Sequence, residues 1–359
     1  VVVGTHGKTT TSALLSFVLH RAGRDPSFLV GGVTRDFESN FRLGGGPHFV
    51  VEGDEYDTAW FDKGPKFLHY RPRTAIFTSC EMDHADIYRD EAHYEGAFER
   101  FVALLPRDGY LAACSTSDRP TRIARAAACE VESYSVARDA DWQARDLALG
   151  ADGARFALVR KGRALGPVRL AVGGAHNVEN ALGVAAAATR LGLSFEETAG
   201  GLDAFRGVKR RQEVRGTAGG VTVIDDFAHH PTAVACTLAA VKASFPGRRL
   251  LACFEPRSNT SRRNLHQREY ARSFGDAAAA WLLRPAPTDR VPEVERLDVE
   301  RLARDVSETG RPARVCEAVE EMVEAVAAAA RPGDVVVAMS NGAFGGIWEK
   351  LLAALAARG

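Results

Sequence analysis

A glycine-rich segment near the start of the chain has the composition of a phosphate-binding loop. Residues 4–11 are Gly-Thr-His-Gly-Lys-Thr-Thr-Thr, and they follow apolar residues 1–3, which are typical of a strand end. Glycines let backbone N–H groups close on phosphate oxygens, and a helix N-terminus adds its positive dipole end. Lys8 would neutralise the β- and γ-phosphates of a nucleotide, and the Thr9 hydroxyl would be a ligand for Mg²⁺. Val2 stands where the longer Walker pattern has glycine, so this is the shorter G-x-x-G-K-T form, and a turn that binds nothing is the alternative.

A cluster of acids follows the strand that we expect over residues 48–52. Residues 52–57 are Glu-Gly-Asp-Glu-Tyr-Asp, and these four carboxylates would repel one another without a cation. Because Mg²⁺ takes few carboxylates and keeps phosphate and water oxygens, we expect one of them, Glu52, to be its ligand. A solvated acidic loop is the alternative. The metal site is favoured if this strand end lies beside the phosphate-binding loop, where ligands gather in open α/β sheets.

Two other polar segments could contribute to the same site. His84, in Glu-Met-Asp-His-Ala-Asp, follows a strand expected over residues 74–79. It could bind a second metal, with a carboxylate fixing its tautomer, or it could simply be exposed. Asn177 and Asn180 lie one helical turn apart, so their amides could bind a base or a phosphate, although Asn177 could equally be a helix cap.

The second half of the chain offers a basic triplet, residues 209–211, and an acidic pair, Asp225 and Asp226. The triplet could reach phosphates, or it could be a solvated basic linker. An acidic pair at the end of a strand could hold a ribose or orient an arginine. Both features are therefore candidates for nucleotide contacts from a second domain.

Composition excludes several classes of protein. The 359 residues include 46 Lys and Arg against 46 Asp and Glu, so the chain lacks the basic excess of a protein that coats nucleic acid. Its apolar runs are too short to span a bilayer, and the start of the sequence has no secretion-signal pattern. Six cysteines are scattered without C-x-x-C spacing, which favours free thiols. We therefore expect a cytoplasmic protein with small-molecule substrates, no nucleic-acid partner and no membrane partner.

Short apolar runs alternate with helical patterns, which predicts α/β layers with parallel sheets. Residues 139–172 differ, because alternating polarity and repeated glycines predict small antiparallel hairpins. The length suggests two or perhaps three domains. A second α/β series begins near Gln212, where we place the domain boundary. The expected helices and strands cover these ranges: helices 8–22, 91–105, 177–191, 194–205, 232–244, 297–308, 317–329 and 346–357; strands 1–3, 48–52, 74–79, 110–114, 221–224, 249–254, 279–283 and 335–339.

Taken together and in this order, the polar segments resemble the Mur ligase family, the ATP-dependent amide ligases of peptidoglycan synthesis. The resemblance covers the whole chain. It implies that residues 1–211 form the family's central ATP-binding domain, with a P-loop, and that residues 212–359 form its Rossmann-like C-terminal domain. The family's N-terminal UDP-binding domain would then be absent, and we expect little ligase activity from this chain alone.

Within the family, the sequence is most similar to the subgroup that joins UDP-N-acetylmuramate to L-alanyl-γ-D-glutamyl-meso-diaminopimelate in peptidoglycan recycling. The resemblance is strongest in residues 53–63, 66–70, 255–260 and 339–346. The branch that adds free L-alanine to UDP-N-acetylmuramate is the first alternative, and the insertion over residues 60–70 and the segment of residues 255–260 argue against it. A P-loop protein that binds nucleotide without ligating anything is the second, although the sequence has no N-K-x-D guanine signature.

The resemblance also implies a set of site residues that use ATP and Mg²⁺. The catalytic residues would be Lys8, Glu52 and His84. The metal ligands would be Thr9, Glu52 and His84. The ATP-binding residues would be Gly4, Thr5, His6, Gly7, Lys8, Thr9, Thr10, Asn180, Arg211 and Asp226. The tripeptide-binding residues would be Arg257, Ser258, Asn259 and Asn341.

One departure from the family pattern concerns the second metal. Several relatives carry a carbamylated lysine at the position that falls on Phe98 here. Phenylalanine cannot be carbamylated, so a second metal in this chain would have to do without that ligand. The branch that adds free L-alanine also lacks this lysine.

Overall fold

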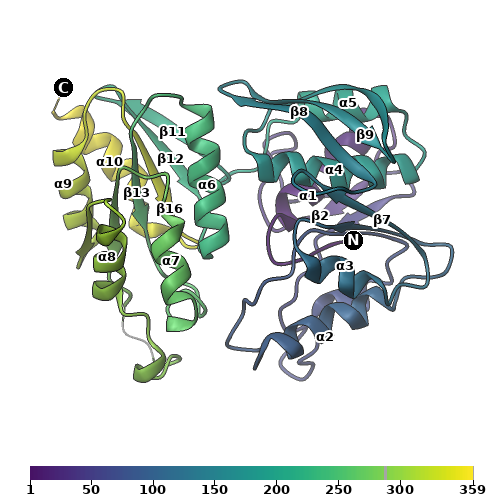
Figure 1. Ribbon diagram of the computed structural model, residues 1–359, viewed down its shortest axis with the longest axis horizontal. Coiled ribbons are helices and arrows are strands. Elements are labelled where there is room, and N and C mark those ends of the chain that lie inside the picture. Colours follow the sequence, from purple (N-terminus) through teal and green to yellow (C-terminus); the bar gives the residue numbers. More distant parts are fainter. Residues whose placement is uncertain (287–288, 359) are drawn as a thin grey trace. The chain divides into compact units, whose positions relative to one another are not determined.

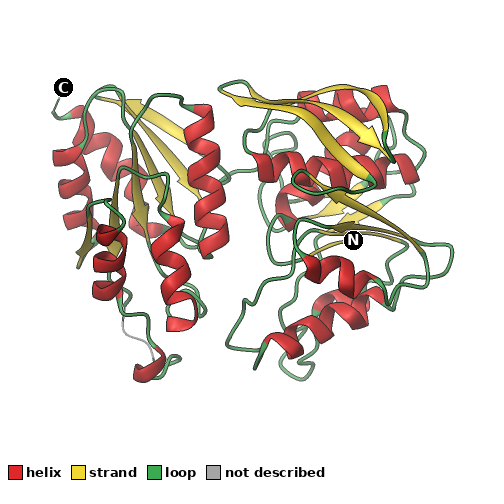
Figure 2. Ribbon diagram, viewed as in Figure 1, coloured by secondary structure: helices red, strands yellow, loops and turns green. Residues whose placement is uncertain are grey.

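The computed structural model describes residues 1–286 and 289–358. The chain forms two compact units, Val1–Lys209 and Arg210–Gly359. Each unit has a mainly parallel sheet between helices (Figures 1 and 2), which confirms the α/β fold class. The boundary that we expect near Gln212 lies just after the junction of the two units.

The first unit contains a sheet of seven described strands in the order β1-β5-β6-β7-β8-β9-β10. The strands from β1 to β8 pair in parallel, whereas β9 and β10 continue the sheet as antiparallel hairpins. The antiparallel region expected over residues 139–172 is therefore confirmed, as an extension of the main sheet. The strands are β1 (Val2–Val3), β5 (Thr74–Phe77), β6 (Tyr110–Cys114), β7 (Glu130–Ser135), β8 (Trp142–Gly150), β9 (Gly153–Arg160) and β10 (Arg163–Leu170).

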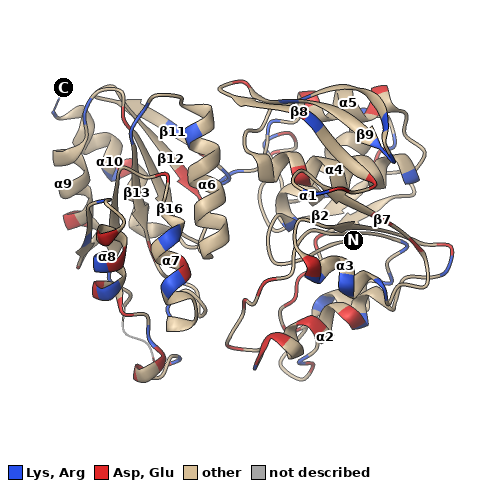
Figure 3. Cartoon of the chain, in the orientation of Figure 1, with Lys and Arg blue, Asp and Glu red and all other residues tan. Residues whose placement is uncertain are grey.

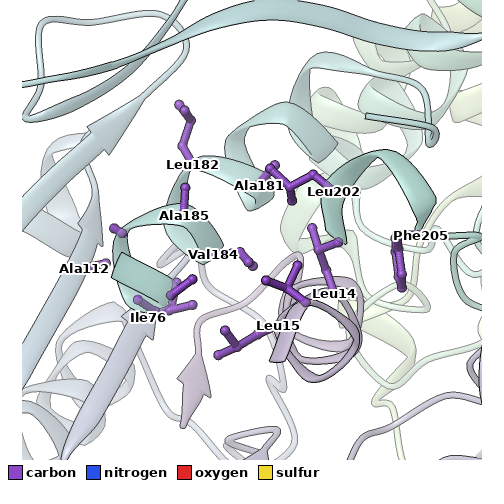
Figure 4. Packing of buried hydrophobic residues seen from close by; sticks show 14 of the residues in the cluster. Leu14, Leu15, Ile76, Ala112, Ala181, Leu182, Val184, Ala185, Leu202 and Phe205 are labelled. Atoms are coloured by element: carbon purple, nitrogen blue, oxygen red, sulfur yellow. The ribbon is translucent and has the colours of Figure 1, made fainter. Parts of the chain in front are cut away.

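Helices cover both faces of this sheet, and alternate strand residues point to each face. Ile76 and Ala112 pack with the helices α1 (Lys8–Arg21), α4 (Ala175–Arg190) and α5 (Phe195–Ala204). Figure 4 shows Leu14, Leu15, Ala181 and Val184 meeting there. Phe77 and Leu111 face the other way, toward α2 (Glu91–Val102) and α3 (Asp118–Ala124). This two-sided burial places the ends of the parallel strands, and the loops after them, on a rigid scaffold.

A small second sheet lies beside the phosphate-binding loop. It contains β2 (Ser27–Leu29), β3 (Phe41–Arg42) and β4 (Phe49–Val51), with β2 parallel to β4 and antiparallel to β3. The last residue of β4 is followed by Glu52, which forms an isolated parallel bridge with Val2. The small sheet thus brings the acidic segment next to β1.

The second unit has a six-stranded sheet among its described residues, in the order β11-β12-β16-β13-β14-β15. All neighbours are parallel except β11 and β12. The strands are β11 (Glu213–Ala218), β12 (Val221–Asp226), β13 (Leu250–Phe254), β14 (Ala279–Leu283), β15 (Ala313–Cys316) and β16 (Val335–Met339). One face packs on α6 (Pro231–Ser244), α7 (Gln267–Ser273) and α8 (Val299–Glu308), and the other on α9 (Val319–Ala329) and α10 (Ile347–Ala356). Short 3-10 helices cover Lys66–His69, Asn264–His266, Glu293–Glu295 and Phe344–Gly346.

Charged residues of both signs alternate over the helices (Figure 3), in keeping with the zero net charge. On the outer face of the first unit, for example, Arg122 of α3 pairs with Glu95 of α2, with 2.5 Å between Nη2 and Oε2. No helix within residues 1–286 and 289–358 is both long enough and apolar enough to cross a bilayer.

One buried carboxylate ties the central and hairpin parts of the first sheet together. Glu132 on β7 is 1% exposed. Its Oε2 accepts hydrogen bonds from the Tyr110 hydroxyl and the Trp142 indole N–H, each at 2.7 Å. Its Oε1 lies 2.8 Å from an Arg160 nitrogen and 2.7 Å from the Lys161 amine. Burial alone would raise the pKa of Glu132, but these four donors lower it to about 2.

We expect Glu132→Gln to lower the free energy of unfolding by about 2–3 kcal/mol, the usual worth of hydrogen bonds to a charged group. Because the pKa is depressed in the folded state, this contribution is fully present above the ordinary pKa near 4.5. It is lost as pH falls toward about 2. Urea denaturation at pH 7 and pH 3 checks both statements. Glu130→Gln on the same strand, where the carboxylate is half exposed, is the control, and an equal effect of the two changes would contradict the prediction.

Candidate active site

The segment of residues 4–7 connects β1 to α1, as expected, and it is anchored to the residues after β5. The Thr5 backbone N–H donates to the Ser79 carbonyl at 3.1 Å, and the His6 N–H donates to the Ser79 hydroxyl at 2.8 Å. The Thr78 hydroxyl donates to the His6 carbonyl at 2.5 Å. The loop is therefore held at the carboxyl ends of two neighbouring parallel strands, the usual place for ligands in α/β sheets.

Both glycines of the loop are required by its shape. Gly4 has a φ of +130° and Gly7 a φ of +81°, a backbone conformation that glycine adopts without strain. A Cβ on Gly7 would also lie 2.5 Å from the side-chain oxygen of Asn180. The Asn180 amide in turn donates to the Asn177 side chain at 3.3 Å. The structure thus brings Asn180 against the loop, while the Asn177 amide donates to the Gly173 carbonyl at 2.7 Å, before its own helix.

The Lys8 amine curls back over the loop from the first turn of α1. It donates to the Gly4 carbonyl at 2.6 Å and to the Thr5 carbonyl at 3.2 Å, and it lies 2.8 Å from the Glu55 carboxylate. Burial alone would lower the pKa of Lys8, but the charges of Glu55 and Glu52 outweigh it and raise that pKa above its ordinary value. The Lys8 amine is therefore positively charged at neutral pH.

The Glu52 carboxylate lies next to Thr9, the residue that follows Lys8 on α1. The Thr9 hydroxyl donates to Glu52 Oε1 at 3.0 Å, and the Gly31 N–H donates to Oε2 at 2.6 Å. The strand end that carries Glu52 is next to the phosphate-binding loop, which is the neighbourhood on which the magnesium prediction depends. A hydroxyl and a carboxylate held this close are the oxygen ligands that Mg²⁺ prefers.

Glu55 is the residue that sequence reasoning did not single out. Its side chain is 1% exposed, and its Oε1 accepts from both Lys8 at 2.8 Å and His84 Nε2 at 2.9 Å. The Tyr88 hydroxyl donates to its backbone carbonyl at 2.7 Å. Burial would raise the pKa of Glu55, but Lys8 and His84 lower it, so the group is a carboxylate. Its Oε2 is buried and has no hydrogen-bond partner in the part of the chain that the structure describes.

His84 is therefore part of this cluster and not an exposed loop residue. Its ring packs edge-on against Tyr56, with centroids 4.2 Å apart, and its backbone N–H donates to the Asp83 carboxylate at 2.7 Å. Burial would lower the pKa of His84, but Asp83 and Glu55 raise it. The position of the family's carbamylated lysine, Phe98, is fully buried and stacks on Phe77 at 5.0 Å, so it offers no ligand atom.

Three other residues expected to bind ATP are Thr5 and His6 in the loop and Thr10 on α1. The Thr5 hydroxyl lies 2.9 Å from the Tyr94 hydroxyl and donates to the Glu81 carbonyl, also at 2.9 Å. His6 Nε2 lies 3.2 Å from the Glu81 carboxylate. Thr10 is buried on α1. These contacts order the loop, and direct contact of Thr5, His6 and Thr10 with a nucleotide stays a prediction.

In the second unit, Asp226 and Arg211 lie at the carboxyl end of β12. Asp226 is 5% exposed, and its two oxygens accept from the Gln212 N–H at 2.8 Å, the Ala228 N–H at 2.8 Å and the Thr237 hydroxyl at 3.1 Å. The Arg211 guanidinium lies over the Phe227 ring, 4.5 Å from its centroid. Asp226 therefore orders the start of its own unit, and the contacts of both residues with ATP stay predictions.

The four residues expected to bind the tripeptide lie in loops after β13 and β16, which are neighbouring strands. A Cβ on Gly342 would collide with the Arg257 side chain, so Arg257 packs on the backbone just after Asn341. The Asn341 side-chain oxygen is buried and has no hydrogen-bond partner within the described residues. The Ser258 hydroxyl is already used inside its turn, where it accepts from the Ser261 N–H at 2.9 Å. Asn259 lies in the same turn.

Family models match both units. The model described as "Mur ligase middle domain" matches residues 2–188, and the model described as "Mur ligase, glutamate ligase domain" matches residues 210–342. The chain belongs to the Mur ligase family. Members of this family are ATP-dependent ligases that form C–N bonds, and the resemblance inferred from the polar segments is confirmed.

Individual relatives cover nearly the whole chain. The UDP-N-acetylmuramate–L-alanyl-γ-D-glutamyl-meso-2,6-diaminoheptandioate ligase of Escherichia coli K12 is 39% identical over 99% of this chain and 75% of its own length. A solved murein peptide ligase from Psychrobacter arcticus 273-4 is 34% identical, covers 99% of this chain and 76% of that one, and has a TM-score of 0.71. The UDP-N-acetylmuramate–L-alanine ligase of Variovorax paradoxus S110 is 36% identical over 99% of this chain and 74% of its own length.

We expect Glu55→Gln to destabilise the nucleotide-free protein by about 3 kcal/mol, because it leaves the buried Lys8 ammonium without its anion. Asp54→Asn next to it is the matched control. Asp54 and its partner Lys66 are both more than a third exposed, so that pair is worth at most about 1 kcal/mol. Chemical denaturation of both variants measures the difference, and equal losses would mean that Glu55 does not hold the cluster.

Proposed function

We propose that the chain carries the ATP-binding and acceptor-binding parts of a ligase that forms the amide between the carboxylate of UDP-N-acetylmuramate and the amine of L-alanyl-γ-D-glutamyl-meso-diaminopimelate. The observation that carries this proposal is the Lys8 ammonium, held by loop carbonyls and Glu55 directly beside the Thr9–Glu52 pair. A cation, a helix N-terminus and a set of oxygen ligands at one strand edge are the parts that phosphoryl transfer requires.

In this proposal the loop binds the triphosphate. The backbone N–H groups at the start of α1 face the phosphates, and Gly7 allows them to approach closely. Lys8 exchanges its bonds to the loop carbonyls for bonds to the β- and γ-phosphate oxygens. Because charge develops on those oxygens in the transition state, a cation already in position lowers the barrier without reorganisation.

The residues around the loop also fit Mg²⁺. Thr9 and Glu52 hold two oxygen atoms 3.0 Å apart, and the Glu55 carboxylate, whose Oε1 lies 2.9 Å from His84, supplies negative charge there. Thr9 and Glu52 would be the protein ligands of one ion, and His84 with Glu55 would flank a second. When bound, the ion neutralises phosphate charge and polarises the γ-phosphoryl group for attack.

The chemistry has two steps. An oxygen of the muramoyl carboxylate attacks the γ-phosphorus, the bond to the β-γ bridging oxygen breaks, and ADP leaves behind an acyl phosphate. The uncharged amine of the L-alanyl residue then attacks the acyl carbon. The tetrahedral intermediate expels inorganic phosphate and the nitrogen loses a proton, which gives the amide. Lys8 serves the first step, since it lies where the phosphoryl charge develops.

The choice of acceptor rests on the similarity to ligases named for the tripeptide and on the segment of residues 53–70, which the structure shows as a braced loop. The Lys63 amine lies 2.7 Å from Asp57, and His69 lies 2.9 Å from Asp62. A ligase that adds free L-alanine is the second candidate, because such enzymes are also more than 30% identical to this chain.

We expect Lys8→Ala to weaken binding of a non-hydrolysable ATP analogue with Mg²⁺ by about 100-fold, the equivalent of losing about 2.7 kcal/mol of charge-assisted hydrogen bonds. Isothermal titration calorimetry measures this directly and does not depend on turnover. Lys63→Ala, which removes a largely exposed amine, should leave the affinity unchanged. Unaltered nucleotide binding by Lys8→Ala would remove the basis of the proposal.

We expect the full-length gene product to release phosphate from ATP when UDP-N-acetylmuramate and the tripeptide are both present, and to use free L-alanine at least 100-fold less efficiently. Coupled phosphate release with mass spectrometry of the product measures both. Efficient use of alanine would favour the second candidate. Phosphate release that is independent of any acceptor would favour a protein that binds and hydrolyses nucleotide without ligation.

A further inference from the structure

Among the described residues, three donors converge on one oxygen of the buried Glu55 carboxylate. Its Oε1 lies 2.8 Å from the Lys8 amine and 2.9 Å from His84 Nε2. The Tyr94 hydroxyl is the third donor, but it lies 3.5 Å from the same oxygen, beyond the usual length of an O–H···O hydrogen bond. Because a carboxylate oxygen has two lone pairs, Lys8 and His84 already fill Oε1, and Tyr94 stays at its margin.

A second acceptor lies within reach of the Tyr94 hydroxyl. Its oxygen lies 2.9 Å from the side-chain oxygen of Thr5, in the phosphate-binding loop. The Thr5 hydroxyl donates to the Glu81 carbonyl at 2.9 Å and accepts from the Glu81 N–H, also at 2.9 Å. The proton of Thr5 is therefore already used, and Tyr94 donates its own proton to the Thr5 oxygen.

The Tyr94 ring is held between these two acceptors. Tyr94 lies on α2 and is 1% exposed. Its ring makes edge contacts with Tyr88, at 4.8 Å between centroids, and with Phe98, at 5.1 Å. Burial and the charge of Glu55 raise the pKa of Tyr94 well above its ordinary value, so the hydroxyl keeps its proton at neutral pH. Tyr94 is therefore a fixed donor with one proton and a choice of acceptors.

Binding of a triphosphate would change which acceptor is available. When the Lys8 amine turns to the β- and γ-phosphate oxygens, Glu55 Oε1 loses one of its close donors. A buried carboxylate that loses a donor is destabilised, and the other oxygen, Oε2, has no hydrogen-bond partner within the described part of the chain. The Tyr94 hydroxyl, 3.5 Å away, can then move to the open lone pair of Oε1.

We propose that Tyr94 is a positioning residue of the nucleotide site, whose hydroxyl donates to Thr5 before nucleotide binds and turns to Glu55 when Lys8 engages the phosphates. The proposal rests on the proposed function and adds a residue that the sequence did not single out. The exchange keeps Glu55 paired while Lys8 moves, so it favours nucleotide binding. Since Thr5 keeps both of its bonds to Glu81, the loop stays anchored throughout.

Tyr94→Phe removes the hydroxyl and keeps the ring contacts. In the full-length gene product, we expect it to weaken binding of a non-hydrolysable ATP analogue with Mg²⁺ by about 10-fold, measured by calorimetry. Tyr110→Phe is the matched control, because the Tyr110 hydroxyl also donates to a buried carboxylate, that of Glu132. Tyr110 begins β6, whereas the loop lies at the carboxyl ends of the strands. The control should therefore lower the unfolding temperature and leave the nucleotide affinity unchanged.

A second measurement needs no nucleotide. In Lys8→Ala, Glu55 lacks its lysine permanently, so Tyr94 should already donate to Glu55. Tyr94→Phe should therefore lower the unfolding temperature by about 2 °C or less in the wild type and by about 4 °C or more in the Lys8→Ala protein. Tyr110→Phe should lower it equally in both proteins, because Tyr110 and Glu132 belong to a separate cluster.

Equal temperature shifts for Tyr94→Phe in the two proteins would overturn the exchange, and so would a folded Tyr94→Phe variant with wild-type affinity for the analogue. Either result would leave the proposed function intact. A Tyr94→Phe variant that does not fold would also overturn the exchange, because the hydroxyl would then be needed before nucleotide binds. A wild type that does not bind the analogue would overturn the proposed function, and the exchange with it.

Discussion

The site in the first unit depends on one buried carboxylate between a lysine and a histidine. Glu55 has almost no exposed surface, yet it accepts hydrogen bonds from Lys8 and His84 on the same oxygen. A buried carboxylate without a partner would be destabilising at this position, and so would the Lys8 ammonium without its anion. The three groups therefore stabilise one another, and their arrangement sets the position of the Lys8 amine above the phosphate-binding loop. In the proposed function, a triphosphate would take over part of the role of Glu55 as the anionic partner of Lys8.

The fold supports this cluster by bringing four separate segments to one strand edge. The parallel pairing of β1 with β5 places the loop of residues 4–7 beside Thr78 and Ser79, and the small sheet places Glu52 beside Val2. Asn180 then closes on Gly7 from α4. Each of these segments continues from a strand or helix whose apolar side is buried in the core (Figure 4). The polar groups can be held this precisely because the elements behind them cannot shift without opening that core.

Much of this arrangement could be predicted from local patterns. The loop of residues 4–7, the strand β6 and the helices α1 and α4 follow from glycine spacing and apolar periodicity, which are properties of the sequence itself. The strands β2, β3, β7 and β15 and the helices α3 and α7 could not be predicted in the same way. Most of them are short, and in β7 and β15 polar residues such as Glu130 and Arg314 interrupt the apolar pattern. The pairing that makes them strands is a tertiary interaction.

The same limit explains why Glu52 could be proposed from the sequence and Glu55 could not. The segment of residues 52–57 contains four acidic residues that the sequence alone does not distinguish. In the folded protein Glu55 is buried, whereas Asp54 and Asp57 pair with lysines nearer the surface. His84 shows the same effect, because a loop histidine between two aspartates is usually exposed, whereas this one is buried against Tyr56 and Glu55. The spacing of residues along the sequence does not predict which of these side chains are buried.

The two units also differ in how their buried charged groups are balanced by groups of opposite charge. In the first unit, Lys8, Glu55 and Glu132 all have partners of opposite charge within the protein. In the second unit, Arg262 feels the charges of Arg257, Glu255 and Arg290, and its buried Nε lacks a hydrogen-bond partner within the described part of the chain. A cation in that position costs stability in the unliganded protein. Buried charge is thus balanced within the protein at the first unit's site and only in part around Arg262.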